Sequence, residues 1–126
     1  MTSAAVTVFC AVWHGDAGRA ELIAAHRDNL RRQSMPVEVI YVFDGGDAPL
    51  PGLEAHNITS SSPLTIYQAW NLALAAVKTP LVMNPNLDDR LAPDAVEKLA
   101  AIWRQAARRW PAATGASATA KARPTR

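Results

Sequence analysis

The sequence predicts an α/β domain in which helices cover both faces of a mostly parallel sheet. Short runs rich in β-branched residues alternate along the chain with longer segments whose apolar residues recur at helical spacing. Gly, Pro, Asn and Asp, which form turns, separate most of these segments. The chain has 126 residues, 49% of them hydrophobic, which is enough for one domain with a single core.

Four apolar runs are predicted to be strands. Residues 6–13 and 37–43 are rich in β-branched and aromatic residues and should lie at the centre of the sheet. Residues 81–83 form a short run between two prolines and are expected as a third core strand. Residues 54–58 are expected as a short edge strand. The parallel arrangement follows because most of these runs are separated by helical segments.

Three segments are predicted to be helices. The first covers residues 17–33, with Asp16 in position to cap its first turn. The second opens at Thr65 and Gln68, which have capping-box spacing, and the third at Pro93, a residue suited to a first helical position. The residues expected on the buried faces are Leu22, Ile23, His26 and Leu30, then Ile66, Trp70, Ala73, Leu74 and Val77, then Val96, Leu99, Ala100, Trp103 and Trp110.

Basic residues are concentrated at the C-terminal end. Residues 1–103 contain 7 Lys or Arg against 11 Asp or Glu, whereas residues 104–126 contain 6 Lys or Arg and no acid. We expect a domain over residues 1–110 and a disordered basic tail over residues 111–126, because the tail has no large apolar residue. Nucleic-acid binding would depend on the tail alone and is not expected.

The chain is expected to be cytoplasmic. It has no apolar run long enough to cross a bilayer, and its first residues lack the basic region of a signal peptide. Cys10 is the only cysteine, which excludes an intramolecular disulfide and fits a reducing compartment. Its position within an apolar run predicts a buried, unreactive thiol.

Polar residues follow three of the predicted strands at the point where each strand ends. Trp13 and His14 end the first, Asp44 follows the second, and residues 86–89 follow the strand at 81–83. Ligands of parallel sheets bind outside the carboxyl ends of the strands, so we expect these groups to share one rim. Asp44 is equally well suited to be a turn former before the two glycines that follow it.

Asp88 and Asp89 are adjacent carboxylates at this predicted rim. Ionised groups are costly to bury without a partner, and a divalent cation held together with the phosphates of a ligand would explain them. The alternative is a solvated loop in which Asp89 pairs with Arg90. We favour the ligand site.

In this order, these motifs resemble the amino-terminal half of a family 2 glycosyltransferase with the GT-A fold. Residues 6–13 resemble its opening strand, and residues 39–46 (Val-Ile-Tyr-Val-Phe-Asp-Gly-Gly) the strand that ends in Asp-Asp-Gly-Ser. Residues 69–74 resemble its Ala-x-Asn-x-Gly-Leu helix segment, and residues 86–89 its Asp-x-Asp element. The resemblance implies a three-layer, Rossmann-like GT-A fold that is incomplete, because it extends over residues 5–105 only.

The resemblance also implies a ligand, a cofactor and a reaction. The family transfers a hexosyl group from a nucleoside-diphosphate sugar to an acceptor hydroxyl, here unknown, with Mg²⁺ or Mn²⁺ bridging the diphosphate. Asp88 would hold the metal, or Asp89 if the alignment shifts by one residue. The residues implied in nucleotide-sugar binding are Trp13, His14, Asp44, Asn71 and Asn86. Asn71 lies in mid-helix, where Asn is intrinsically poor, and is expected to support the site more than to contact the ligand.

Departures from the family pattern limit the expected activity. Phe43 replaces the first Asp of Asp-Asp-Gly-Ser, and Asn86 replaces the first carboxylate of Asp-x-Asp. The family's second half, which supplies the acceptor site and the carboxylate base, has no counterpart in this sequence. We therefore expect donor binding with little or no transfer. The alternative is a non-enzymic α/β binding or interaction module with a basic tail.

Overall fold

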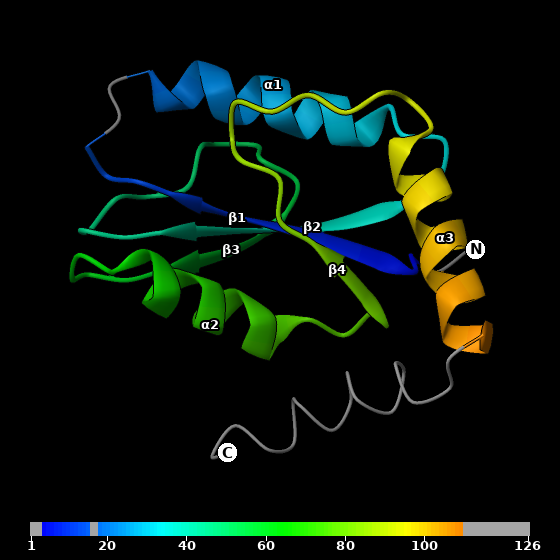
Figure 1. Ribbon diagram of the computed structural model, residues 1–126. Helices are drawn as coiled ribbons and strands as arrows, with labels where there is room; N and C mark the ends of the chain where they lie inside the picture. Colours follow the sequence, from blue (N-terminus) through cyan, green and yellow to red (C-terminus); the bar gives the residue numbers. More distant parts are fainter. Residues whose placement is uncertain (1–3, 16–17, 110–126) are drawn as a thin grey trace, which may run out of the picture.

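A sheet of four parallel strands forms the centre of the computed structural model, which describes residues 4–15 and 18–109. The strand order is β3-β2-β1-β4, and helices lie on both faces, as the sequence predicts (Figure 1). Residues pair from Val6 with Val37 to Val12 with Phe43, so β1 and β2 end level with each other. The strands are β1 (Val6–Val12), β2 (Val37–Phe43), β3 (His56–Thr59) and β4 (Leu81–Met83).

The two faces of β1 contribute to different parts of the core. Val8 faces α1, whereas Phe9 faces α2, because successive side chains of a strand point to opposite faces. Near the start of the strand, Val6 packs against α3 on the same face as α1. The helices are α1 (Arg19–Arg31), α2 (Ile66–Ala76) and α3 (Ala95–Arg109). None of them has the length and hydropathy to span a bilayer.

Helix α1 buries the face that its spacing predicts. Ile23, His26 and Leu30 are all buried against the sheet, whereas Leu22, the fourth residue expected on this face, is only half-buried. Its N-cap residue is Gly18, which supplies no side-chain cap. Asp16, the residue expected to cap this helix, lies outside the described residues.

Helix α2 begins with the predicted capping box. The Thr65 hydroxyl accepts a hydrogen bond from the Gln68 N–H at 3.1 Å, and the Gln68 side chain accepts one from the Thr65 N–H at 2.9 Å. These two bonds satisfy backbone donors that the first helical turn leaves without partners.

The buried face of α2 agrees only in part with the predicted one. Ala69 and Ala73 are buried, whereas Ile66 and Leu74 are 47% and 41% exposed. The helix rests on the sheet through small residues, and large side chains of the sheet, such as Phe9, fill the space between the layers. Spacing therefore identified an apolar helix and placed Ala73, Trp70 and Val77 correctly at the core, but not Ile66 and Leu74.

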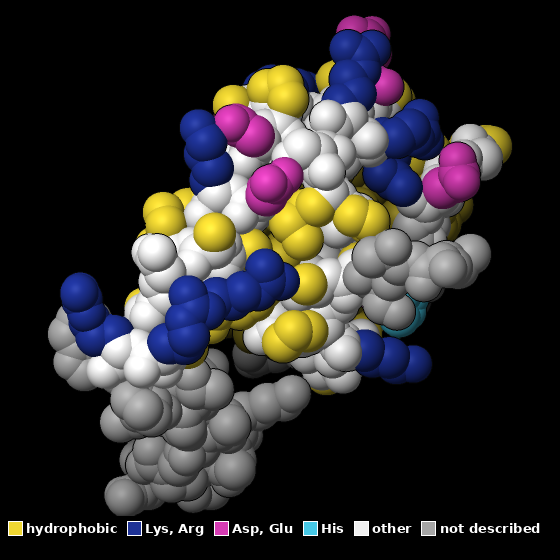
Figure 2. Space-filling view, turned by 90° about the vertical axis from the view of Figure 1, so that its right-hand side faces the viewer, with side chains coloured by type: hydrophobic (Ala, Val, Ile, Leu, Met, Phe, Trp, Pro, Cys, Tyr) yellow, Lys and Arg dark blue, Asp and Glu magenta, His cyan; other side chains and the backbone are white. Residues whose placement is uncertain are grey.

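Strand β4 is an edge strand, not the core strand that its apolar run predicts. Only β1 pairs with it, and Val82 is 43% exposed. Beside it, α3 buries Val96 and Ala100 but leaves other apolar side chains exposed, and a groove of about 360 Å³ is lined by residues of both the helix and the strand. Figure 2 shows apolar and basic side chains together on the face that carries α3. The exposed large apolar residues of α3 are Ile102 and also Leu99 and Trp103, which the spacing wrongly predicts on its buried face. Trp110 lies outside the described residues.

Two isoleucines in helices provide a matched test of this burial pattern. Ile23→Ala, in the α1 core, should lower the free energy of unfolding by about 2–5 kcal/mol because it leaves a cavity. Ile102→Ala, at a side chain that is 60% exposed, should change it by no more than about 0.5 kcal/mol. Urea unfolding of both variants measures the difference. Equal effects would show that α3 is packed differently.

Candidate functional site

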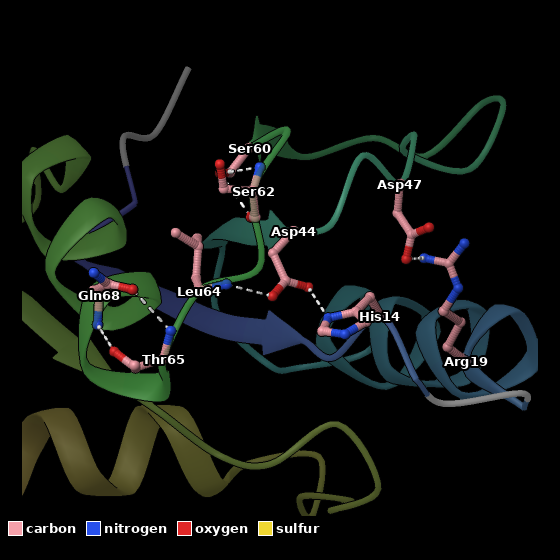
Figure 3. A network of polar contacts seen from close by, with 9 residues as sticks. All are labelled: His14, Arg19, Asp44, Asp47, Ser60, Ser62, Leu64, Thr65 and Gln68. Atoms are coloured by element: carbon pink, nitrogen blue, oxygen red, sulfur yellow. Dashed lines mark hydrogen bonds and ion pairs between the residues drawn. The ribbon is translucent and has the colours of Figure 1, made fainter.

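Asp44 joins three parts of the chain at the carboxyl edge of the sheet. Its side chain is buried, and one carboxylate oxygen lies 3.0 Å from Nδ1 of His14, which follows β1. The other oxygen accepts a hydrogen bond of 2.7 Å from the backbone N–H of Leu64, just before α2 (Figure 3). The ends of β1 and β2 and the approach to α2 are therefore held by one side chain.

Asp44 is held in its ionised form. Burial by itself raises the pKa of this carboxyl, because a charged group is costly to desolvate. The hydrogen bonds from the Leu64 N–H and the His14 ring outweigh that cost, so the pKa of Asp44 lies below its ordinary value. A buried charge with two directed donors is a stable arrangement.

Two glycines after Asp44 allow the chain to turn beneath His14. Gly45 and Gly46 have φ values of +64° and +84°, which other residues rarely adopt. A Cβ on Gly45 would also come within 3.1 Å of Cβ and Cγ of His14. Their N–H groups bond to the carbonyls of Ser62 and Ser60 at 3.1 and 3.0 Å. Asp44 therefore belongs to the turn that the sequence predicts, and its side chain also bonds to His14 and to the Leu64 N–H.

A cavity of about 170 Å³ opens beside Asp44, between the ends of β1 and β2 and the start of α2. Asp44 is the one charged residue among its described lining residues. Trp13 stands at the cavity and is 65% exposed. A Cβ on Gly15 would come within 2.9 Å of three atoms of the Trp13 ring, so the indole lies close against the backbone. The other lining residues include Ala11, Leu64, Thr65, Ile66 and Ala69.

Asn86, Asp88 and Asp89 form a self-contained turn after β4. The Asp89 N–H donates to the carbonyl of Asn86 at 3.0 Å, and a carboxylate oxygen of Asp89 accepts from the Asn86 N–H at 2.8 Å. Arg90 donates to the backbone carbonyls of Leu87 and Asp89, not to a carboxylate. The Asp88 side chain is exposed and makes no hydrogen bond or ion pair with the described residues.

The segment that follows this turn is fastened to α1. The Asn29 side chain donates to the carbonyl of Leu91 and accepts from its N–H, both at 2.9 Å. The Gln33 side chain donates to the carbonyl of Ala92 and accepts from the Val96 N–H. Figure 1 shows the chain leaving β4 and running along α1 toward α3. The acidic turn therefore lies on the α1 side of the sheet and does not line the cavity.

A buried polar cluster lies on this same side. Nδ1 of His26 is 2.7 Å from the hydroxyl of Tyr41, and burial together with the charge of Arg90 lowers the pKa of His26 to about 4. Burial also raises the pKa of Cys10 to about 12, and the charges of Asp88 and Asp89 add to this. Cys10 is thus buried, as its position predicts, and its thiol is held in the protonated form.

The predicted site residues separate into two groups. Trp13 and Asp44 line the cavity, and His14, which does not line it, bonds to Asp44. The acidic turn at residues 86–89 is elsewhere, and Asn71 is exposed on α2 and does not line the cavity. The Leu64 N–H, which completes the bonding of Asp44, has no signal in the sequence because every residue except proline carries such a donor.

The described residues do not form a metal site of their own. Within residues 4–15 and 18–109, no three His, Cys, Asp or Glu side chains gather closely enough to hold an ion. One carboxylate of the acidic turn, Asp89, already accepts a backbone N–H. Mg²⁺ can bind through one or two carboxylates when the phosphates of a substrate supply other ligands. A metal ion would therefore need oxygens from a bound ligand in addition to Asp88.

Comparison of the chain with models of known protein families and with curated protein sequences finds no match. The fold and the site therefore define the class of protein. It is an α/β protein with an all-parallel, four-stranded sheet, and it has a small cavity at the carboxyl ends of β1 and β2.

Replacing Asp44 tests its role in the fold. Asp44→Asn should lower the free energy of unfolding by about 1–3 kcal/mol at pH 7, because it replaces two buried, charge-assisted hydrogen bonds by neutral ones. Since the pKa of Asp44 is depressed in the folded state, its stabilisation is complete above the ordinary Asp pKa of about 3.9 and is lost as the pH falls further. Urea unfolding from pH 7 to pH 3 should show the two proteins converging below about pH 4.

Asp28→Asn is the control for this experiment. Asp28 forms an exposed ion pair with Arg32 at 3.1 Å, one turn away on α1. Its replacement should change the free energy of unfolding by no more than about 0.5 kcal/mol. A gap between Asp44→Asn and the wild type that stays constant down to pH 3 would contradict the proposed stabilisation by the ionised carboxylate.

Proposed function

We propose that this chain is the nucleotide-sugar-binding part of a family 2-like glycosyltransferase. The observation that carries the proposal is the cavity at the carboxyl ends of β1 and β2, with Trp13 and Asp44 in its lining. The chain passes from β1 to β2 on one side and later returns to β4 on the other. Parallel α/β sheets bind ligands at such reversals of strand order, outside the carboxyl ends of the strands.

The cavity would receive the nucleoside end of the ligand. Its volume, about 170 Å³, is below the roughly 300–1,000 Å³ of a typical small-molecule site, so it would take one part of a larger molecule. The exposed indole of Trp13 offers a planar face on which a base can stack. Apolar neighbours such as Leu64 and Ile66 favour a ring over a charged group.

The diphosphate and the sugar would extend outside the cavity toward the acidic turn. Asp88 would bind Mg²⁺ or Mn²⁺ together with phosphate oxygens, and Asn86 would assist at the donor. Such an ion neutralises the charge of a diphosphate leaving group when it is bound. This part of the proposal rests on the motif order and on the free carboxylate of Asp88.

We propose binding without transfer for this chain by itself. A glycosyltransferase of this kind needs a carboxylate base beside the donor to accept the proton of the acceptor hydroxyl. The one described carboxylate that lines the cavity, Asp44, is buried with both oxygens bonded. Glu97 accepts a hydrogen bond from Ser34 at 2.7 Å, beyond the end of α1. Neither is positioned as that base.

Thermal unfolding with nucleotide sugars tests this function. UDP-, GDP- and dTDP-sugars should be compared with and without Mn²⁺, and one of them should raise the melting temperature. At a ligand concentration 100-fold above Kd, binding stabilises the folded state by about 2.7 kcal/mol. Asp88→Ala should remove the part of the shift that depends on Mn²⁺ and keep the part that does not.

Asp94→Ala is the matched control for Asp88→Ala, because Asp94 is another exposed carboxylate and pairs with Lys98 on α3. Its shift should equal that of the wild type. No shift with any donor, together with salt-sensitive nucleic-acid binding that is lost on deleting residues 112–126, would favour the non-enzymic module instead. Sugar transfer at a normal enzymatic rate would contradict the proposal of binding without transfer.

A further inference from the structure

His14 is oriented by a buried carboxylate. Its Nδ1 lies 3.0 Å from Asp44, whose second oxygen is fixed by the Leu64 N–H at 2.7 Å. An ionised carboxylate can only accept hydrogen bonds, so Nδ1 must carry the proton that is shared with Asp44. In a neutral imidazole, the lone pair then belongs to Nε2.

Nε2 of His14 is the part of the ring that remains available. The His14 side chain is 38% exposed, and Nε2 makes no hydrogen bond to the described residues. Figure 3 shows the far edge of the ring directed away from Asp44. The ring rests on Gly45, where a Cβ would approach Cγ of His14 to 3.1 Å, so its position is restricted before any ligand arrives.

His14 also stands beside the cavity. It does not line the cavity itself, but it follows the lining residue Trp13 in the chain and bonds to the lining residue Asp44. The rings of Trp13 and His14 are 5.7 Å apart, with an angle of 53° between their planes. The two rings are therefore close enough for one flat ligand group to contact both.

The other two histidines lack this arrangement. His26 is 1% exposed, and its partner is a hydroxyl of Tyr41, which can donate or accept and so does not select a tautomer. His56 is exposed on the edge strand β3. A buried carboxylate that fixes one ring nitrogen while the other stays accessible is found at His14 alone among the three.

We propose that His14 accepts a hydrogen bond through Nε2 from an N–H or O–H group of the bound nucleoside, with Asp44 as the positioning residue that sets its tautomer. The ligand half of this proposal rests on the proposed function, whereas the tautomer half does not. A hydrogen-bond acceptor at this place favours a base N–H or a ribose hydroxyl over a phosphate, which has only acceptors to offer.

The tautomer can be measured without a ligand. Long-range ¹H–¹⁵N spectra of the imidazoles at pH 8, where an ordinary histidine is neutral, should show His14 protonated at Nδ1 and not at Nε2. Asp44→Asn should reverse this, because its amide can donate to Nδ1 while its oxygen still accepts from Leu64. A wild-type His14 that is protonated at Nε2, or at both nitrogens, overturns the proposal.

Two variants of His14 distinguish its hydrogen bond to Asp44 from its proposed hydrogen bond to the ligand. In His14→Asn, the amide nitrogen takes the place of Nδ1, so the bond to Asp44 is kept and the outward acceptor is removed. This variant should keep the melting temperature of the wild type and weaken the binding of UDP, GDP or dTDP, whichever binds, by about 3- to 10-fold, the loss expected for one hydrogen bond. His14→Gln, whose amide can reach the position of Nε2, should recover part of the affinity. His56→Asn is the control and should bind normally.

Analogues identify which donor of the ligand is recognised. For UDP or GDP, the 2′-deoxy diphosphate tests the ribose hydroxyl, and for any of the three an N-methylated base tests the ring N–H. One of these analogues should bind more weakly to the wild type but not to His14→Asn. If the nucleotide binds the wild type and His14→Asn equally, the role of His14 is wrong while the proposed function stands. If no nucleotide binds the wild type, the proposed function fails, and with it the ligand half of this proposal.

Discussion

A buried, ionised carboxylate is the constraint on which this structure depends. Asp44 must find partners at the end of β2, because a desolvated charge without them would destabilise the fold. It finds them in His14 and in the Leu64 N–H, which belong to segments far apart in the sequence. The pairing of β1 with β2 makes this possible, since the two strands end level with each other. Sheet register and site geometry are therefore linked.

The cavity beside Asp44 exists because small side chains meet there. Ala11 at the end of β1 and Ala69 in the first turn of α2 both line it, and larger residues at these positions would fill the space. Small residues also allow α2 to lie close to the sheet, and Ala73 is fully buried. One pattern of alanines thus explains the position of the helix and the hollow at its start.

Local patterns predicted the elements well, while contacts between distant segments were not predictable. The β-branched runs identified β1 and β2, and Thr65 with Gln68 identified the start of α2. The path of the acidic turn depends on side chains of α1, such as Asn29, which bond to backbone groups more than 60 residues away. Backbone donors look the same in every sequence, so neither this path nor the second partner of Asp44 could be inferred from residue types.

The separation of the acidic turn from the cavity affects how a ligand would be held. Asp44 has no free oxygen to offer a metal ion, and Asp88 does not line the cavity. A nucleoside in the cavity and an ion at Asp88 would therefore be connected through the ligand's own phosphates, and no protein side chain would join them directly. In such an arrangement, the nucleoside end supplies the part of the affinity that does not depend on the metal. The ion adds only the part that comes from its contacts with the diphosphate. The recognition proposed for His14 belongs to the first of these contributions, because it depends on Asp44 and not on the acidic turn.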